Sequence, residues 1–168
     1  TTKLVVRAAH AVGALAEAEL GHVGRGVEYQ SFGAQRKGFT DPALAARFVA
    51  ETGVDLLAVA IGNAHGLYDG QPMIDLDLLR AIKQGTGVPL VLHGGTGLSE
   101  EQFRSAIAGG ITKVNIATDL YVTTTRRLAE ALASKPMIYA DVINLSRASF
   151  RERCAYYFDL FGASGTGV

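Results

Sequence analysis

Polar side chains that could bind a metal ion or a substrate follow four apolar runs of the chain. In chain order they are Glu17 and Glu19, Asn63 and His65, His93, and Asn115 and Thr118. Two imidazoles and a carboxylate that converge would form a divalent metal site, and neutral imidazole suits Zn²⁺ best. A lone histidine more often has a hydrogen-bonded structural role. Because His65 and His93 occur as a pair, each followed by glycine, metal binding stands on an equal footing with that alternative.

The carboxylates Glu17 and Glu19 stand two residues apart, so on a strand they face the same way. With alanines at positions 16 and 18 beside them, one or both are expected to point into the interior. A carboxylate there needs a cation or hydrogen-bond donors. The alternative is that they pair with a neighbouring Lys or Arg.

Two glycine-rich turns are candidates for binding phosphate. HGGTG at 93–97 follows one apolar run, and the glycines at 109 and 110 precede KVNIATD, which places Asn115 and Thr118 before a predicted helix. Closely approaching backbone amides and the positive end of a helix dipole both favour an oxyanion. The alternative is that these glycines only form tight turns.

The apolar runs alternate with helical patterns along the chain. Strands are predicted over 14–20, 56–61, 89–92 and 113–117, and helices over 2–12, 42–52, 76–84, 100–108, 118–132 and about 140–161. Runs that are apolar on both faces, such as LLAVAI at 56–61, are typical of parallel strands covered on both sides. The pattern therefore predicts a parallel α/β fold, whose ligands bind at the carboxyl ends of the strands.

The segment 22–39 interrupts this alternation with four glycines among polar residues. A loop of this length in a compact domain is more often a functional lid than a passive connection, so we predict a mobile active-site loop. An ordinary surface excursion is the alternative. Asp119, near the other end of the chain, is expected to begin a helix rather than to catalyse.

The composition excludes several classes of protein. The chain has 168 residues, 48% hydrophobic and 19% charged, as is ordinary for one soluble globular domain. Sixteen basic residues balance sixteen acidic ones, so no net basic field exists to hold a nucleic acid. No apolar run is long enough to span a membrane. The single Cys154, without a recognisable secretory leader, predicts the cytoplasm.

Four longer stretches resemble one enzyme family. AEAELG at 16–21, the segment 40–68 that ends in AHGLY, PLVLHGGTGLS at 89–99 and GITKVNIATDL at 110–120 are similar to the class II, zinc-dependent fructose-bisphosphate and tagatose-bisphosphate aldolases. The resemblance implies an α/β fold, the (β/α)8 TIM barrel, of which residues 1–168 would hold strands five to eight and the C-terminal helix. It also implies reversible, zinc-dependent cleavage of a ketose 1,6-bisphosphate, with fructose 1,6-bisphosphate the leading substrate, into dihydroxyacetone phosphate and glyceraldehyde 3-phosphate.

The resemblance also implies roles for single residues. His65 and His93 would be two of three zinc ligands, and Glu19 the carboxylate at an alternative metal position. Asn115 would contact the triose near the reacting carbon, and Glu28, shifted from the family's usual place in this loop, would be the acid that moves protons. The remaining residues would bind phosphate, with Na⁺ or K⁺ beside it: Gly66, Gly94, Gly95, Thr96, Asn115, Ala117 and Thr118.

Two features limit what the resemblance implies. No lysine is expected to form a Schiff base, because Lys113 would begin its strand on the opposite rim. The family's first four strands, with the third zinc histidine and a catalytic aspartate, have no counterpart before Thr1. Three other functions therefore stay open: a non-catalytic fragment or subunit that binds phosphorylated sugar, a metal-free phosphosugar isomerase, and an aldolase for tagatose bisphosphate or another phosphorylated ketose. The family forms dimers and tetramers, so a homo-oligomer is expected.

Overall fold

A four-stranded parallel sheet forms the centre of the first of two compact units, residues 1–115. The computed structural model describes residues 1–28 and 36–166 of the chain. The strands are β1 (Glu17–Leu20), β3 (Leu56–Val59), β5 (Leu90–Leu92) and β6 (Ile111–Val114), in the order β1-β3-β5-β6. The two central strands are buried on both faces, as the continuous apolar runs predict.

Helices precede or connect these strands, and their ends follow the expected capping chemistry. They are α1 (Thr2–Ala11), α3 (Pro42–Thr52), α4 (Leu76–Thr86) and α5 (Glu100–Ala108). Asp41 accepts a hydrogen bond from the Leu44 amide at 2.7 Å, and Gly53 ends α3 in the left-handed conformation. Ser99 and Gln102 form a capping box at the start of α5.

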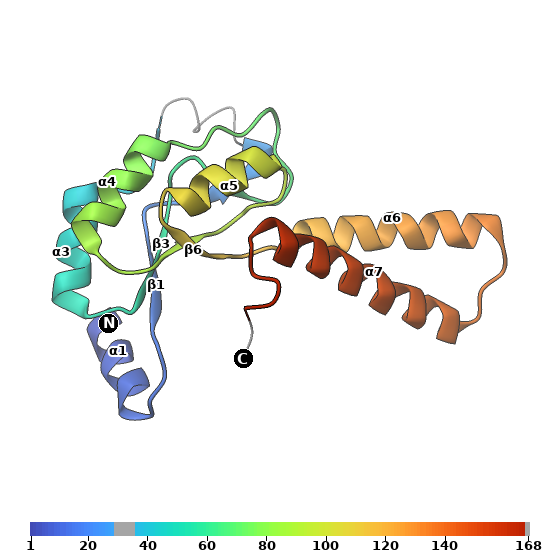
Figure 1. Cartoon of the computed structure of the whole chain (residues 1–168), viewed down its shortest axis with the longest axis horizontal. Coiled ribbons are helices and arrows are strands. Elements are labelled where there is room, and N and C mark those ends of the chain that lie inside the picture. The colour runs from blue at the N-terminus through green and yellow to red at the C-terminus, as the bar shows by residue number, and fades with distance from the viewer. Residues whose placement is uncertain (29–35, 167–168) are drawn as a thin grey trace. The chain divides into compact units, whose positions relative to one another are not determined.

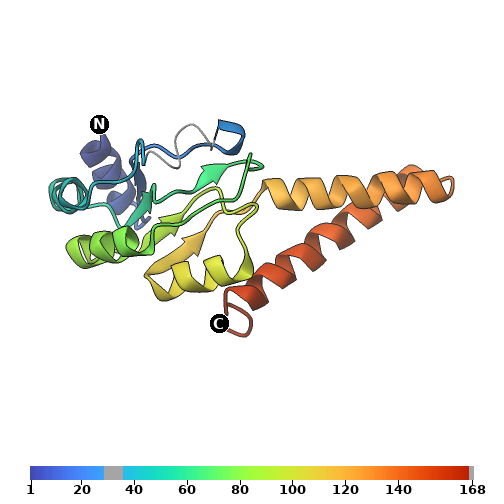
Figure 2. The ribbon, with the colours of Figure 1, turned by 90° about the horizontal axis from the view of Figure 1, so that it is seen from above.

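The apolar core lies between the sheet and these helices. Figure 2 shows α4 and α5 along one face of the sheet, and their inward side chains, such as Leu79, Ile82 and Phe103, are buried. Tight packing on that side directs the polar strand residues to the other face. The polar strand residues therefore share the face of the sheet that lies opposite α4 and α5.

Three short elements were not predicted. β2 (Gly24–Arg25) and β4 (Ala64–His65) pair in parallel, with Arg25 opposite His65, and the 3₁₀ helix η1 (Gly26–Glu28) follows β2. Both β2 and η1 lie inside the segment 22–39 that was predicted as a mobile loop. The His22 amide donates to the Gly38 carbonyl at 2.8 Å, so the two ends of this segment lie side by side. Residues 29–35 lie outside the described residues, and the mobility of the loop stays a prediction.

The last predicted strand is wrong in its limits. The sequence places it at 113–117, whereas β6 covers Ile111–Val114. The Asn115 amide still donates to the Leu92 carbonyl at 2.9 Å, and the chain then leaves the sheet. Ile111 follows Gly109 and Gly110 directly and is buried in the apolar core, which fixes the start of β6 at this residue.

The second unit, residues 116–168, contains two helices, α6 (Thr118–Ser134) and α7 (Tyr139–Leu160), close to their predicted limits. They pack against each other as a hairpin (Figure 1). Asp119, in the first turn of α6 as expected, accepts hydrogen bonds from Arg153 and Tyr157 of α7. Among the described residues, no helix is both long and apolar enough to cross a membrane.

Candidate metal centre

Three elements of the first unit bring potential metal ligands to one place. Glu19 lies on β1, His65 on β4, and His93 directly after β5. Each offers one ligand atom, and these atoms lie within 4.8 Å of one another. The two imidazole rings are 5.9 Å apart. The structure therefore brings together the three predicted metal ligands, and two imidazoles with one carboxylate are a donor set that fits Zn²⁺.

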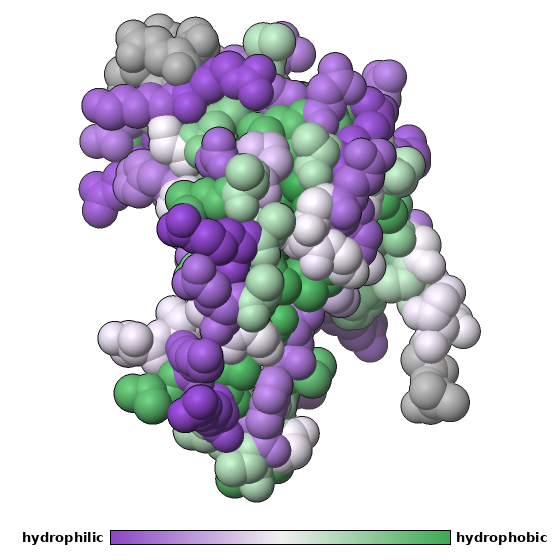
Figure 3. Space-filling model, turned by 90° about the vertical axis from the view of Figure 1, so that its left-hand side faces the viewer, coloured by the Kyte–Doolittle hydropathy of each residue, from purple (hydrophilic) through white to green (hydrophobic). Residues whose placement is uncertain are grey.

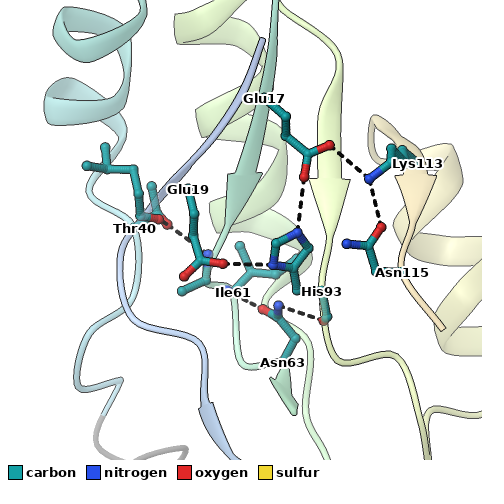
Figure 4. Close-up of polar contacts among 10 residues, drawn as sticks. Glu17, Glu19, Thr40, Ile61, Asn63, His93, Lys113 and Asn115 are labelled. Atoms are coloured by element: carbon teal, nitrogen blue, oxygen red, sulfur yellow. Dashed lines mark hydrogen bonds and ion pairs between the residues drawn. The ribbon is translucent and has the colours of Figure 1, made fainter. Parts of the chain in front are cut away.

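The imidazole of His93 stands between two carboxylates. Its Nδ1 lies 2.7 Å from Glu19 Oε2, and its Nε2 lies 3.2 Å from Glu17 Oε1 (Figure 4). A histidine that binds a metal through one nitrogen commonly has its other nitrogen oriented by a carboxylate. Glu17 is in a position to orient His93 in this way, while Glu19 faces the nitrogen on the metal side.

Glu17 is also held by a cation. Lys113 Nζ donates to Glu17 Oε2 at 2.8 Å and to Asn115 Oδ1 at 2.8 Å. Partial burial opposes ionisation of Glu17, but the hydrogen bonds and charges of Lys113 and His93 outweigh it and lower the pKa of Glu17 below its ordinary value. The alternative considered for the strand carboxylates, pairing with a lysine, is therefore what the structure has at Glu17.

The prediction that Lys113 lies on the opposite rim is wrong. Lys113 is the third residue of β6, one residue before its carboxyl end, because the strand begins at Ile111 and not at Lys113. From there its long side chain reaches Glu17 on β1, across the sheet. The error in the strand limits and the error in the placement of Lys113 have one cause.

Two residues that the sequence did not single out as supports hold the histidine turns together. Asn63 is buried; its Oδ1 accepts from the Ile61 amide at 2.8 Å, and its Nδ2 donates to the His93 carbonyl at 2.9 Å (Figure 4). Tyr68 Oη accepts from the Ala64 amide at 2.6 Å and donates to the Gly94 carbonyl at 3.0 Å. The position of Asn63 at a strand end is visible in the sequence, but its structural role is not, and Tyr68 appears only as part of AHGLY.

The close approach of the two turns requires a glycine at position 94. Gly94 has φ of +64°, and a Cβ there would lie 2.0 Å from the Ala64 carbonyl oxygen. Both the backbone conformation and the lack of space exclude other residues. Gly94 thus joins the turn after β5 to the residue before His65.

The other predicted binding residues are placed as follows. Gly66 has φ of +84° with open space around it, and Gly95 and Thr96 are buried in the turn before α5. Glu28 ends η1 and is exposed, and it is not among the three grouped metal ligands. Ala117 and Thr118 belong to the second unit, at the start of α6, where Ala117 forms no side-chain cap. The phosphate, cation and proton-transfer roles of these residues stay predictions.

Comparison with known proteins places the chain in a family. The family model described as class II fructose-bisphosphate aldolase matches residues 1–166. The chain belongs to the class II fructose-bisphosphate aldolase family. The predicted family is thereby confirmed. Its members supply the α/β fold, the TIM barrel, of which the parallel sheet described above is a part.

Individual relatives of this aldolase family agree. The chain is 38% identical over 164 residues to the protein YdjI of Escherichia coli K12, covering 98% of this chain and 58% of YdjI. It is 39% identical over 166 residues to fructose-bisphosphate aldolase of Geobacillus stearothermophilus, covering 98% of this chain and 57% of that enzyme. The crystal structure of the Escherichia coli YdjI aldolase superposes with a TM-score of 0.83 at 34% identity, over 99% of this chain and 56% of that one. The chain thus spans somewhat more than half the length of these relatives.

Proposed function

We propose that the chain forms the metal-binding and triose-phosphate-binding part of a zinc-dependent aldolase. Its reaction is the reversible cleavage of a ketose 1,6-bisphosphate, fructose 1,6-bisphosphate in the first place, to dihydroxyacetone phosphate and glyceraldehyde 3-phosphate. The observation that carries the proposal is the convergence of Glu19, His65 and His93 on the polar face of the sheet. Membership of the aldolase family supports it.

The zinc ligands in this chain would be His65 and His93, with Glu19 at an alternative position. When bound, Zn²⁺ supplies a Lewis acid that stabilises the negative charge developing next to the ketone as the carbon–carbon bond breaks. Asn63 and Tyr68 keep the two histidine turns in register, as their hydrogen bonds to the His93 carbonyl and the Ala64 amide indicate. Positioning of this kind is what a reaction that depends on fixed charges requires.

The substrate would be held at its phosphate, away from the bond that breaks. Gly66, Gly94, Gly95 and Thr96 would present backbone amides and a hydroxyl, with Na⁺ or K⁺ as a bound monovalent cation. Ala117 and Thr118, at the start of α6 in the second unit, would bind phosphate through backbone amides. Binding energy gained at the phosphate then orients the reacting carbons. These lining groups are backbone-rich, which suits an oxyanion rather than a neutral ligand.

Two side chains would act on the triose and on protons. Asn115 would donate from its amide to an oxygen of dihydroxyacetone phosphate near the reacting carbon. Glu28, at the end of η1 and exposed, would transfer protons. A carboxylate at an exposed loop end is accessible to water and can be protonated again between turnovers.

A direct test is the cleavage assay with the native protein. Zinc-loaded protein is incubated with fructose 1,6-bisphosphate or tagatose 1,6-bisphosphate, and triose phosphate is measured with and without a chelator. We expect cleavage of at least one substrate, abolished by chelation and restored by Zn²⁺. Undiminished cleavage after complete removal of metal would contradict the dependence on zinc, and absence of any cleavage would contradict the proposed reaction.

A second candidate function uses the same residues without turnover. The chain spans 58% of YdjI and 57% of the Geobacillus enzyme. A subunit that binds phosphorylated sugar and metal without turnover would account for the same residues. Titration with Zn²⁺ and dihydroxyacetone phosphate separates the two: phosphate binding with weak metal retention and no cleavage favours this candidate.

We further propose that the protein is a cytoplasmic homo-oligomer, a dimer or a tetramer. Large apolar side chains are exposed on and after α1, among them Leu4 (68%), Val5 (58%), Val12 (80%) and Leu15 (73%). Figure 3 shows apolar residues among hydrophilic ones at the lower end of this face of the molecule. Exposed apolar side chains that lie close together are often covered by another protein chain. Sedimentation equilibrium of the native protein would measure the state, and a strict monomer would contradict it.

A further inference from the structure

Lys113 connects the group proposed to bind the triose with the support of a metal ligand. Its ammonium donates to Asn115 Oδ1 on one side and to Glu17 Oε2 on the other, each at 2.8 Å. The other oxygen of Glu17 lies 3.2 Å from His93 Nε2. Figure 4 shows the resulting chain of contacts from Asn115 through Lys113 and Glu17 to His93.

An irregularity in the sheet directs Lys113 to this face. Leu90 pairs with Ile111, but the next residue, Val91, pairs with Lys113, so Thr112 is an extra residue on β6. Paired residues of neighbouring strands point to the same face. Without the extra residue, Val91 would pair with Thr112, and Lys113 would point to the helix side. A bulge of this type commonly redirects a side chain next to a functional site.

The ammonium also determines which way the Asn115 amide faces. Lysine has three donors and no acceptor, so it can bind only the oxygen of the amide. The flipped amide would place its NH₂ group against the ammonium, two donors in contact with no acceptor between them. The oxygen therefore faces Lys113, and Figure 4 shows the nitrogen on the side of His93.

Small side chains on the intervening strands leave room for this bridge. In register, Glu19 pairs with Ala58, Ala58 with Val91, and Val91 with Lys113, so all four occupy one row on the same face. Ala58 and Val91 are fully buried and do not project as far as the acidic and basic ends of the row. The row thus has an acid, Glu19, at one end, a base, Lys113, at the other, and two short apolar side chains between them.

We propose that Lys113 is a positioning residue: it fixes the Asn115 amide with its NH₂ directed toward the metal centre, and it holds Glu17 behind His93. The inference rests on the proposed function, in which Asn115 donates to the triose. Lys113 acts through Asn115 and Glu17 and forms no bond to the substrate. Its ammonium is engaged by a carboxylate, which is the arrangement of a structural cation rather than of a nucleophile.

The test compares Lys113→Met with Lys3→Met, a control at an exposed lysine of α1, in the zinc-loaded native protein. We expect Lys113→Met to lower kcat by about 10- to 100-fold, the range typical of outer-sphere partners, with KM little changed. In an Asn115→Ala background the same substitution should lower kcat less, because only the effect through Glu17 and His93 is left. Equal losses in both backgrounds would overturn the proposal, as would a Lys113→Met variant with the activity of the control. Should Lys113→Met fail to fold, Lys113→Gln replaces it.

A second readout does not need turnover. The side-chain NH₂ signals of Asn115 are identified in ¹⁵N NMR by their loss in Asn115→Ala. We expect the side-chain amide to hold one orientation in the native protein and to average over several orientations in Lys113→Met. If the native protein cleaves no ketose bisphosphate, the proposed function fails, while this loss of order would still support the positioning contact. Unchanged order in the variant would overturn it. Borohydride trapping of dihydroxyacetone phosphate on Lys113 would also overturn it, because the lysine would then be a nucleophile.

Discussion

The two compact units each contain a cluster of acidic and basic side chains, but their charges balance differently. On the sheet, the carboxylates of Glu17 and Glu19 face a single ammonium, that of Lys113, with His93 between them. In the helical hairpin, the carboxylate of Asp119 faces the guanidinium of Arg153. The first cluster thus has two carboxylates for one ammonium, and the second has one carboxylate for one guanidinium. Carboxylates that lie beside imidazole nitrogens attract a metal cation, whereas a matched ion pair stabilises the fold.

The two clusters also differ in the side chains that surround them and in how far they are exposed. The guanidinium of Arg153 lies over the rings of Tyr156 and Tyr157, at 4.2 and 4.9 Å from their centroids, and Tyr157 Oη donates to Asp119. Partners on a single helix pair thus enclose this ion pair. The side chain of Glu19, in contrast, is 37% exposed, and its neighbours come from separate strands and turns. When side chains from several elements converge, they can leave a space between them that a bound ion can occupy.

The largest effect expected from this difference is on metal affinity. His93→Ala removes the nitrogen that faces Glu19, so we expect zinc binding to weaken by more than about 100-fold, beyond what loss of an outer partner causes. Zinc at 100 times its dissociation constant should stabilise the native protein by about 2.7 kcal/mol, and this gain should vanish in the variant. Competition with a chelating dye and thermal unfolding with and without Zn²⁺ measure both.

The matched control for that variant is His10→Ala. His10 also pairs with a carboxylate, Asp55 at 2.9 Å, but it lies on α1 and is exposed. Zinc affinity should be unchanged by this substitution. Equal losses in the two histidine variants would show that zinc binds elsewhere.

The helical cluster should respond in the opposite way. Arg153→Met removes the charged partner of Asp119, which is largely shielded from solvent, and we expect the free energy of unfolding to fall by about 2 kcal/mol. Zinc affinity should not change. Arg104→Met, which breaks an exposed pair with Glu100 on α5, should cost no more than about 0.5 kcal/mol. Urea unfolding measures the three proteins, and a zinc effect of Arg153→Met would contradict the separation of roles.

The sequence was sufficient to predict the parallel fold and the convergence of the ligands. Apolar runs followed by His65 and by His93 predict that the two histidines converge, and the structure has their rings 5.9 Å apart, although His65 lies on the separate strand β4. Caps such as Asp41, Asp75 and Ser99 mark the helix starts because their chemistry is local. Residue types alone therefore predict the features that depend on the apolar pattern of a strand or on a local helix cap.

The bridge of Lys113 could not be predicted in this way. It depends on the extra residue Thr112 in β6, and nothing in the ITKV sequence distinguishes a bulged strand from a regular one. The roles of Asn63 and Tyr68 depend in the same way on two turns that meet only in the folded chain. These contacts join segments that are distant in sequence and depend on strand register and turn geometry. Residue types alone do not predict them.

A smaller effect on the metal centre is expected from Tyr68, which supports it through hydrogen bonds. Tyr68→Phe leaves the Ala64 amide and the Gly94 carbonyl without this hydroxyl, so the turns that carry His65 and His93 lose a common anchor. We expect zinc affinity to weaken by about 10-fold, the lower end of the range for outer partners. Tyr139→Phe, at a side chain that is 79% exposed, is the control. Unchanged zinc affinity in Tyr68→Phe would mean that Asn63 and Gly94 hold the turns without it.

The smallest effect concerns the pH dependence of the helical hairpin. Burial, and then the carboxylate of Asp119, raise the pKa of Tyr157 above its ordinary value of 10.0. A group whose pKa is higher in the folded state stabilises the fold below its unfolded pKa, and this contribution is lost as the pH rises above that value. The free energy of unfolding of the native protein should therefore decline from about pH 10 upward.

Tyr157→Phe tests this dependence. Its free energy of unfolding should be lower by about 1 kcal/mol at neutral pH, because the hydrogen bond of the phenol is lost. The decline of the free energy of unfolding above about pH 10 should be shallower in this variant. Urea unfolding at neutral and alkaline pH, with Tyr139→Phe as the reference, measures both. An equally steep decline in Tyr157→Phe would place the alkaline transition on another group and leave Asp119 and Arg153 as a pair that does not depend on the phenol.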